Sequence, residues 1–335
     1  MDVSLIICTF NRCQSLRQTL ESVCDLNIPK GLEWELLVVD NNSQDATREA
    51  CEAFTGRLPL RHLFEPLQGA SRARNCAIAK AQAPLLFFSD DDVTFDRNWF
   101  VNLWQAVKKH PEISIFAGRI MGVWEEGAPG WLKENARSML RLVSAHLDLG
   151  EAEQVIDKID KGPWGANMAL RKSLLGDEFR FSPHFGRVGQ ATMHVRAGET
   201  EMIQRLYRLG HKGLYVGKAI VYHRNPAAHA TERYVFSYFR GAGKTEIRLM
   251  GRPPEGKLWL GAPRYFWLKV VKHALQYALF RWTKPPEVWL RARIEWGRNW
   301  GRLLESRRIH NNGHSPAALQ TRPRCEVEDV LISER

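Results

Sequence analysis

The sequence predicts an α/β fold, in which a mostly parallel sheet is flanked by helices and followed by C-terminal amphipathic helices. Two observations predict it. Short apolar runs alternate with helix-like segments over the first hundred residues, and three of these runs end in polar signatures. Strands that alternate with helices form βαβ units and a parallel sheet. Ligands bind such sheets beyond the carboxyl ends of the strands, so the site is expected where these polar signatures meet.

The elements follow from the spacing of apolar residues. Apolar runs predict buried strands over 3–8, 34–39 and 85–89, and a weaker strand over 60–64. Apolar residues at helical spacing predict helices over 14–26, 45–54 and 71–81. Asp45 or Ser43 is expected to cap the second helix. Beyond residue 110, we expect a strand over 113–116, a helix over 199–209 and a strand over 214–222 that ends at His223.

The segment beyond residue 230 is strongly basic. Residues 233–310 contain 17 Lys or Arg and 5 Glu, a balance of +12 in a chain whose net charge is +11. One helix is expected over 264–282, with a polar stripe at Lys269, Lys272, His273 and Gln276. A second helix is expected after Pro286, with an apolar face at Trp289, Trp296, Trp300 and Leu303. Tryptophan combined with basic charge favours a peripheral membrane segment, while two solvated helices packed on the rest of the chain are the alternative.

Composition bears on where the protein works. The chain has 335 residues, enough for one large domain or two smaller ones. Its first residues lack the basic and long apolar regions of a signal peptide, and no unbroken apolar run reaches about 18 residues. The six cysteines form no CxxC pair, so reduced thiols are expected. We therefore expect a cytoplasmic protein, peripheral at the inner face of the cell membrane.

An acidic triplet at Asp90, Asp91 and Asp92 directly follows the fourth predicted strand. Adjacent carboxylates repel one another, and a hard divalent cation offsets that repulsion. Mg²⁺ and Mn²⁺ prefer oxygen ligands and commonly bridge carboxylates to substrate phosphates. The alternative is a solvated loop in which Asp92 caps the next helix. The buried strand before the triplet, together with the polar ends of two other strands, favours a site for a metal and a diphosphate.

Two further polar positions suit a nucleotide ligand. Asp40 ends the second strand, where a carboxylate can accept hydrogen bonds from a ribose or a base, although a role in the turn is equally compatible. Arg74 lies in the first turns of a helix, and guanidinium groups bind phosphate oxygens in bidentate geometry. A solvated helical face is the alternative for Arg74.

These residues together resemble the ordered signature of family 2 glycosyltransferases. The resemblance is carried by four segments, at residues 3–12, 38–45, 73–75 and 90–92. It continues more weakly to His223 and so covers roughly the first 225 residues. The family has the GT-A fold, a Rossmann-like and mostly parallel sheet, and inverts the anomeric centre of the transferred sugar. The resemblance implies a catalytic domain over 1–230, with a nucleotide-binding half at 1–110 and an acceptor half at 111–230. A basic helical region at 231–306 and a flexible tail at 307–335 follow.

The resemblance also implies roles for individual residues. The nucleotide would be bound by Thr9, Asn11, Arg12 and Asp40, with Arg74 on the donor phosphates and Asp91 facing the ribose or sugar. Asp90 and Asp92 would hold Mn²⁺ or Mg²⁺. The family's base lies in a Glu-Asp pair that opens a helix, whereas this chain has Gly198-Glu199-Thr200-Glu201. Glu199 is therefore the candidate base and Glu201 the second choice; both also suit the first turn of a helix.

Other residues are weaker candidates. His223 ends a strand and can lie near the metal, although a lone histidine is more often structural. Trp164, Gly165 and Asn167 are candidates for the acceptor site, where Trp164 would stack on a sugar ring, with core packing as its alternative. Residues 241–245, Gly-Ala-Gly-Lys-Thr, imitate the end of a P-loop, but position 238 is Tyr238 where that motif needs glycine.

The expected reaction is transfer of a sugar from a UDP-, GDP- or dTDP-sugar to a glycan or lipid-linked acceptor. Two alternatives remain open. A nucleotidyltransferase can share such a sheet, but needs a glycine-rich basic loop that residues 9–12 lack. A nucleic-acid-binding protein would explain the basic segment through phosphate contacts and base stacking, but leaves the acidic triplet unexplained. We therefore expect no nucleic-acid partner.

Overall fold

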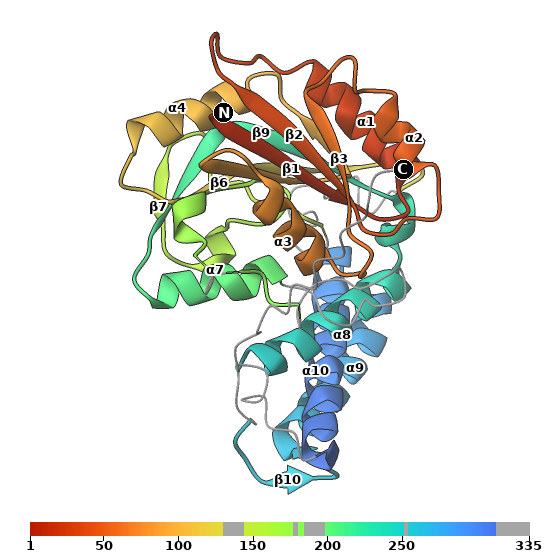
Figure 1. The fold of residues 1–335 in the computed structure, drawn as a ribbon. Helices are drawn as coiled ribbons and strands as arrows, with labels where there is room; N and C mark the ends of the chain where they lie inside the picture. The colour runs from red at the N-terminus through yellow and green to blue at the C-terminus, as the bar shows by residue number, and fades with distance from the viewer. Residues whose placement is uncertain (130–143, 177–179, 184–197, 251–253, 313–335) are drawn as a thin grey trace.

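One sheet organises the chain up to residue 225. The computed structural model describes residues 1–129, 144–176, 180–183, 198–250 and 254–312, and in these ranges a layer of long helices follows the sheet (Figure 1). The strands of the large sheet, in chain order, are β1 (Val3–Thr9), β2 (Trp34–Asp40), β3 (Leu60–Phe64), β4 (Leu85–Asp90), β5 (Val93–Phe95), β6 (Ile115–Trp124), β7 (Gln154–Ile156), β8 (Met168–Arg171) and β9 (Gly213–Asn225). The predicted α/β class is confirmed.

The sheet has the order β3-β2-β1-β4-β8-β6-β9-β5, and β7 pairs with β9 at the side. The first four strands run parallel to one another, as do β6 and β9. β8 lies antiparallel between β4 and β6, and β5 lies antiparallel on β9. The two expected halves, 1–110 and 111–230, therefore share a single sheet, and β5 of the first half lies at an edge built by the second.

Helices cover both faces of the sheet because its central strands are apolar on both sides. One face carries α1 (Cys13–Cys24), α2 (Thr47–Glu52) and α4 (Trp99–Lys109), and the other carries α3 (Ala70–Lys80) and α7 (Gly198–Arg208). The predicted helix positions are confirmed, but the expected cap of α2 is wrong. Ala46 is the N-cap residue, and the carboxylate of Asp45 instead accepts hydrogen bonds from the Cys13 amide and the Thr47 hydroxyl.

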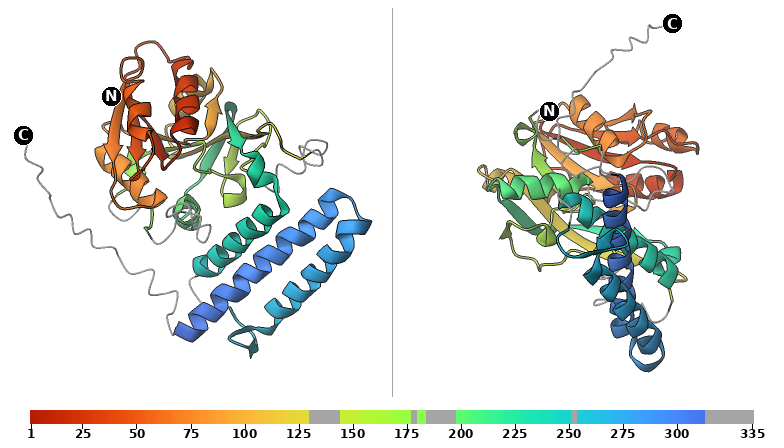
Figure 2. Two further views of the ribbon diagram at one scale, coloured as in Figure 1. Left: turned by 90° about the vertical axis from the view of Figure 1, so that its right-hand side faces the viewer. Right: turned by 90° about the horizontal axis from the view of Figure 1, so that it is seen from below.

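The C-terminal layer contains α8 (Glu232–Leu249), α9 (Arg264–Thr283) and α10 (Pro286–Asn312), with a short hairpin of β10 (Leu258–Trp259) and β11 (Ala262–Pro263) before α9. Figure 2 shows α10 between the other two helices. Gly243 of the false P-loop serves this packing: a Cβ there would lie 2.0 Å from the backbone oxygen of Arg298 in α10. This segment of backbone therefore packs against helix α10 and does not form a phosphate-binding loop.

Two expectations about this layer need correction. The tail was expected from residue 307, but α10 continues to Asn312; residues 313–335 lie outside the described part of the chain. The tryptophan face of the last helix does not point outward. Trp289 and Leu303 are 4% and 1% exposed, and Trp296 and Trp300 are partly buried against neighbouring helices. In the described ranges, no helix has both the length and the apolar character needed to cross a bilayer.

Candidate active site

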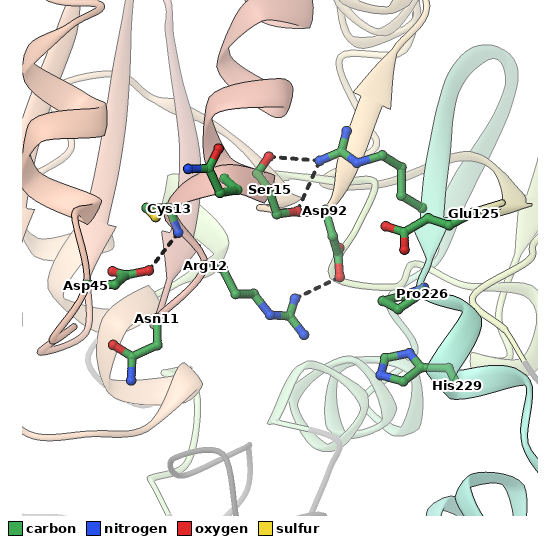
Figure 3. A pocket seen from close by; sticks show the side chains of 11 residues that line it. Asn11, Arg12, Cys13, Ser15, Asp45, Asp92, Glu125, Pro226 and His229 are labelled. Carbon is green, nitrogen blue, oxygen red and sulfur yellow. Dashed lines mark hydrogen bonds and ion pairs between the residues drawn. The ribbon is translucent and has the colours of Figure 1, made fainter. Parts of the chain in front are cut away.

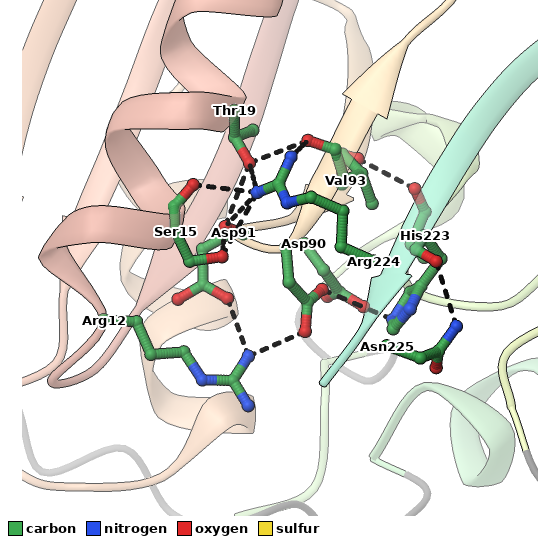
Figure 4. Close-up of polar contacts among 12 residues, drawn as sticks. Arg12, Ser15, Thr19, Asp90, Asp91, Val93, His223, Arg224 and Asn225 are labelled. Carbon is green, nitrogen blue, oxygen red and sulfur yellow. Dashed lines mark hydrogen bonds and ion pairs between the residues drawn. The ribbon is translucent and has the colours of Figure 1, made fainter. Parts of the chain in front are cut away.

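The acidic triplet meets His223 because β5 pairs with β9. Asp90 ends β4, the next two aspartates form the turn, and Val93 of β5 lies opposite His223. This register brings Nε2 of His223 to 3.3 Å from Oδ1 of Asp92. Asp90, Asp92 and His223 each offer one ligand atom, and the three atoms lie within 4.8 Å of one another. Figure 4 shows Asp90 and His223 side by side. The residues predicted to bind metal therefore come together.

This group of side chains fits a divalent cation. Two carboxylates and an imidazole are ligands that Mn²⁺ and related ions accept. Burial raises the pKa of the Asp90 carboxyl, and the neighbouring carboxylate of Asp92 adds to that rise, while the guanidinium of Arg74 opposes it. A cation would offset the negative charge that burial and crowding make costly here.

Arg74 connects this group to the candidate base. Its side chain is 11% exposed and lies 3.5 Å from Oδ1 of Asp90 and 3.2 Å from Oε2 of Glu199. Gly165 makes room for it, since a Cβ at that position would lie 2.7 Å from Nη2 of Arg74. These contacts bring together three predicted site residues: Arg74 for the donor, Gly165 for the acceptor and Glu199 for catalysis.

Glu201 lies apart from this contact. It is on the same helix, 3.5 Å from Arg205, and burial raises the pKa of its carboxyl. Its ion pair therefore stays within α7, whereas Glu199 reaches across to Arg74 in α3.

The side chain of Asp91 points away from the group formed by Asp90, Asp92 and His223 and into the protein. Its carboxylate accepts a hydrogen bond of 2.7 Å from Thr9 and one of 3.0 Å from Arg12, which also binds Asp92 at 2.8 Å. Burial raises the pKa of Asp91 to about 6, although Arg12 works in the opposite direction. Thr9 and Asp91 are 3% and 5% exposed, so their side chains are turned inward. Of these three predicted nucleotide-binding residues, Arg12 lines the cavity described below, and Thr9 and Asp91 do not.

Arg224 also holds this turn in place, a role that was not predicted from the sequence. Its guanidinium donates to the backbone oxygen of Val93 and to Thr94, Ser15 and Thr19, as Figure 4 shows for all but Thr94. Ser15 and Thr19 in turn donate to the backbone oxygen of Asp91. These contacts fasten α1 and the end of β9 to the turn at Asp91 and Asp92. One signal was available, because Ser15 and Thr19 are four residues apart and so lie on one face of a helix.

A cavity of about 340 Å³ opens beside this turn (Figure 3). Such a volume is within the usual range for small-molecule sites. The cavity lies between the start of α1 and the end of β9, and its lining includes Arg12, Asp92, Arg224, Glu125 and His229. The last two were not predicted, and both lie just past strand ends, at β6 and after β9.

Asp40 and Asn11 organise the loops at the ends of the first two strands. The carboxylate of Asp40 is 7% exposed and accepts a hydrogen bond from the Ser43 amide, which is the turn role considered as its alternative. Asn11 has a φ of 50° and joins the two loops: its amide donates to Ser43, and its side chain accepts from the Gln44 amide. Asn11 also lines the cavity, while Asp40 does not.

The prediction that Asn167 binds the acceptor does not fit its surroundings. Its side chain is fully buried, accepts from the Trp99 indole at 2.8 Å and donates to the backbone oxygens of Arg119 and Ala219, both at 2.9 Å. These bonds hold β8 against β6 and β9. Trp164 is half-buried, and its indole donates to the backbone oxygen of Ile159, so only part of its ring is open.

Comparison with known proteins identifies a protein family that this chain matches. A model described as "Glycosyl transferase family 2" matches residues 4–179. The succinoglycan biosynthesis protein ExoM of Rhizobium meliloti is 22% identical over 265 residues, which cover 76% of this chain and 77% of that protein. The glucosyl-dolichyl phosphate glucuronosyltransferase of Haloferax volcanii is 23% identical over 227 residues, covering 67% and 69% of the two chains.

Solved structures share the fold. Staphylococcus aureus TarS residues 1–349, in complex with UDP-GlcNAc, superpose with a TM-score of 0.53 at 15% identity, covering 94% of this chain and 93% of that one. The mannosyltransferase PcManGT from Pyrobaculum calidifontis, in complex with GDP-Man and Mn²⁺, gives a TM-score of 0.55 at 16% identity, covering 92% and 86%. Both matches extend well beyond residues 4–179, so the shared architecture includes the helical layer.

Proposed function

Because this chain belongs to glycosyl transferase family 2, we propose that it transfers a sugar from a nucleotide-sugar donor to an acceptor hydroxyl with inversion, using a divalent cation held by Asp90, Asp92 and His223. The observation that carries the proposal is the contact of this metal-binding group, through Arg74, with Glu199. Family membership favours this reading over the nucleotidyltransferase and nucleic-acid-binding alternatives.

The chemistry assigned to the chain's own residues is a single displacement. The acceptor oxygen bonds to the anomeric carbon as the bond from that carbon to the diphosphate breaks, and the hydroxyl proton passes to Glu199. Arg74 orients Glu199 and contacts the donor phosphates. A bound cation would offset the charge that develops on the departing nucleoside diphosphate. Glu199 is preferred to Glu201 as the base because the latter pairs within its own helix.

The nucleotide is assigned to the loops around the cavity. Arg12 and Asn11 line it and are proposed to contact the nucleotide. Thr9, Asp40 and Asp91 are buried and bonded to neighbouring groups, so we assign them to holding the loops in place. Structural neighbours bound to UDP-GlcNAc and to GDP-Man leave the base of the donor open between uracil and guanine.

The acceptor is proposed to be a glycan or a lipid-linked sugar at the inner face of the cell membrane. Two observations support this. A relative is named for a glucosyl-dolichyl phosphate substrate, and another for succinoglycan biosynthesis. The basic C-terminal segment also suits an anionic membrane surface.

The test is donor hydrolysis and donor binding by the full chain. Purified protein is given UDP-, GDP- and dTDP-sugars with Mn²⁺, Mg²⁺ or EDTA, and release of the nucleoside diphosphate is measured beside calorimetric binding. We expect metal-dependent binding and release with one donor, lost in Asp92→Asn. Glu199→Gln should keep donor binding and lose transfer, while the matched Glu201→Gln should keep both. Failure to bind any donor in the presence of metal would refute the proposal.

A further inference from the structure

One face of α9 exposes a line of large apolar side chains, which we call the α9 stripe. Its members recur every three or four residues and so lie on one side of the helix. They are Leu268, Val271, Leu275, Leu279 and Trp282, with exposures of 71%, 55%, 66%, 61% and 85%. The opposite side of the helix, including Phe266 and Val270, packs inward. Soluble proteins rarely expose so continuous an apolar surface without a function.

The hairpin before α9 extends this surface. Leu258, Trp259 and Leu260 are each more than half exposed. Trp259 packs edge-on against Trp267 of α9, and its backbone oxygen accepts the indole hydrogen bond of that residue. In Figure 2 the hairpin lies at the end of the helical layer that is far from the sheet, and α9 is the outer helix of that layer. Tryptophans thus lie at both ends of the exposed surface.

The exposed charges that α9 adds beside the stripe are positive. Residues 264–283 include no Asp or Glu. Lys269 and Lys272 are exposed along one edge of the stripe, and Arg264 lies at its first end. Arg281, near the other end, forms an ion pair with Glu232 of α8 and adds no free charge. Two copies of this helix facing each other would bring like charges together with no carboxylate from α9 to offset them. An anionic lipid surface supplies the opposite charge, and its interface also accepts tryptophan and leucine.

We propose that the α9 stripe docks this chain on an anionic phospholipid membrane, with α9 lying in the plane of the interface. The proposal deepens the membrane location given above and rests on that part of the proposed function, not on the chemistry of transfer. It also revises which helix is involved. The tryptophans of α10 pack inside the layer, so the contact is confined to α9 and the hairpin before it.

The test measures vesicle binding separately from activity. The full chain is sedimented with phosphatidylcholine vesicles, with and without phosphatidylglycerol, at low and high salt. The double variant Leu275→Glu, Leu279→Glu should bind anionic vesicles at least tenfold more weakly. Lys269→Gln and Lys272→Gln should each weaken binding about fivefold and reduce its salt dependence. The matched control is Leu209→Glu at the end of α7, where the leucine is 61% exposed outside the stripe; it should bind like the wild type.

Donor binding by each variant, measured without vesicles, checks that the fold is intact and keeps the two proposals distinguishable. A chain that binds donor but no anionic vesicle would overturn the docking proposal and leave the transferase proposal standing. A leucine double variant that still binds vesicles like the wild type would also overturn it. Sedimentation velocity gives the remaining contrary result: a dimer that this double variant dissociates, with no vesicle binding, would make the stripe a self-association surface.

Discussion

Adding one methyl group at Gly165 should disable the site without unfolding the protein. A Cβ there would lie 2.7 Å from Nη2 of Arg74 and 3.6 Å from Cδ of Glu199. Ordinary contacts begin at 3.4 Å, so the guanidinium must retreat by about 0.7 Å. It has little freedom to do so, because it is 11% exposed and also lies over the ring of Phe181. The movement therefore draws Arg74 away from its acidic partners.

The size of the effect follows from the contacts that are lost. A hydrogen bond between charged groups contributes about 1.5–3 kcal/mol, so loss of the 3.2 Å contact between Arg74 and Glu199 should lower kcat/KM by roughly 10- to 100-fold. The same contact is present in the folded protein without donor, so its loss should also lower the free energy of unfolding, by at most about 3 kcal/mol. Gly165 does not have a positive φ, so alanine adds no backbone strain there, and the protein should stay folded.

The assay compares Gly165→Ala with Gly56→Ala, a matched change at a glycine where an added Cβ meets nothing within 4 Å. Transfer kinetics, with the donor that the binding test selects, are measured beside urea unfolding. For Gly165→Ala we expect the 10- to 100-fold loss of kcat/KM in a protein that stays folded, and for the control we expect no loss of activity or stability. Wild-type activity of a folded Gly165→Ala protein would show that the contact between Arg74 and Glu199 does not serve the reaction.

Three further outcomes are expected. Gly118→Ala should destabilise the fold by about 3 kcal/mol or more in urea unfolding, because the new Cβ would lie 2.1 Å from the amide of Asn167 and displace its buried hydrogen bonds; equal stability would contradict this. Burial by itself raises the pKa of the Glu35 carboxyl, but hydrogen bonds from its neighbours lower it overall from 4.5. Ionised Glu35 therefore stabilises the fold above about pH 4.5, and this contribution disappears as the pH falls through the lowered pKa. In urea titrations, Glu35→Gln should be less stable than the wild type at neutral pH, and the difference in stability should shrink in acid. If the proposed metal site is correct, Arg224→Lys should weaken calorimetric Mn²⁺ affinity about tenfold, since an ammonium cannot span the contacts that fix the turn at Asp91 and Asp92. Unchanged Mn²⁺ affinity would show that the turn keeps its conformation without Arg224.

β1, β2 and β4 were predictable because each is a buried parallel strand with a mostly apolar sequence, whereas β3, Leu-Arg-His-Leu-Phe, is a weaker and only partly buried strand. Strand β3 was placed without error, and the other three within one residue at each end. Asp90, Asp92 and His223 were predicted to meet, and they do. The sequence could support this because Asp90 and Asp92 lie at and just after the end of β4 and His223 lies near the end of β9, and such strand ends meet at one edge of the sheet.

The other features of the fold and site depend on contacts between segments that are distant in the sequence, and local sequence patterns do not predict such contacts. Strand β5 has only three residues and exists through its pairing with β9. Asn167 seemed a polar residue suited to an acceptor, but the sheet around it uses both ends of its amide. The tryptophans of α10 form the same apolar pattern whether a membrane or another helix covers them, and here α8 and α9 provide the cover.

The position of β5 has a consequence for how the protein is made. Arg224 bonds to Val93 across a sequence separation of 131 residues. A ribosome adding about 5–20 residues per second needs roughly 7–26 s to supply that arginine after Val93 has been synthesised. Until then the three aspartates have neither their strand partner nor the anchor beneath them. The nascent chain therefore cannot complete the proposed donor site until almost the whole sheet has been synthesised. A truncated chain that ends before Arg224 should accordingly have no activity.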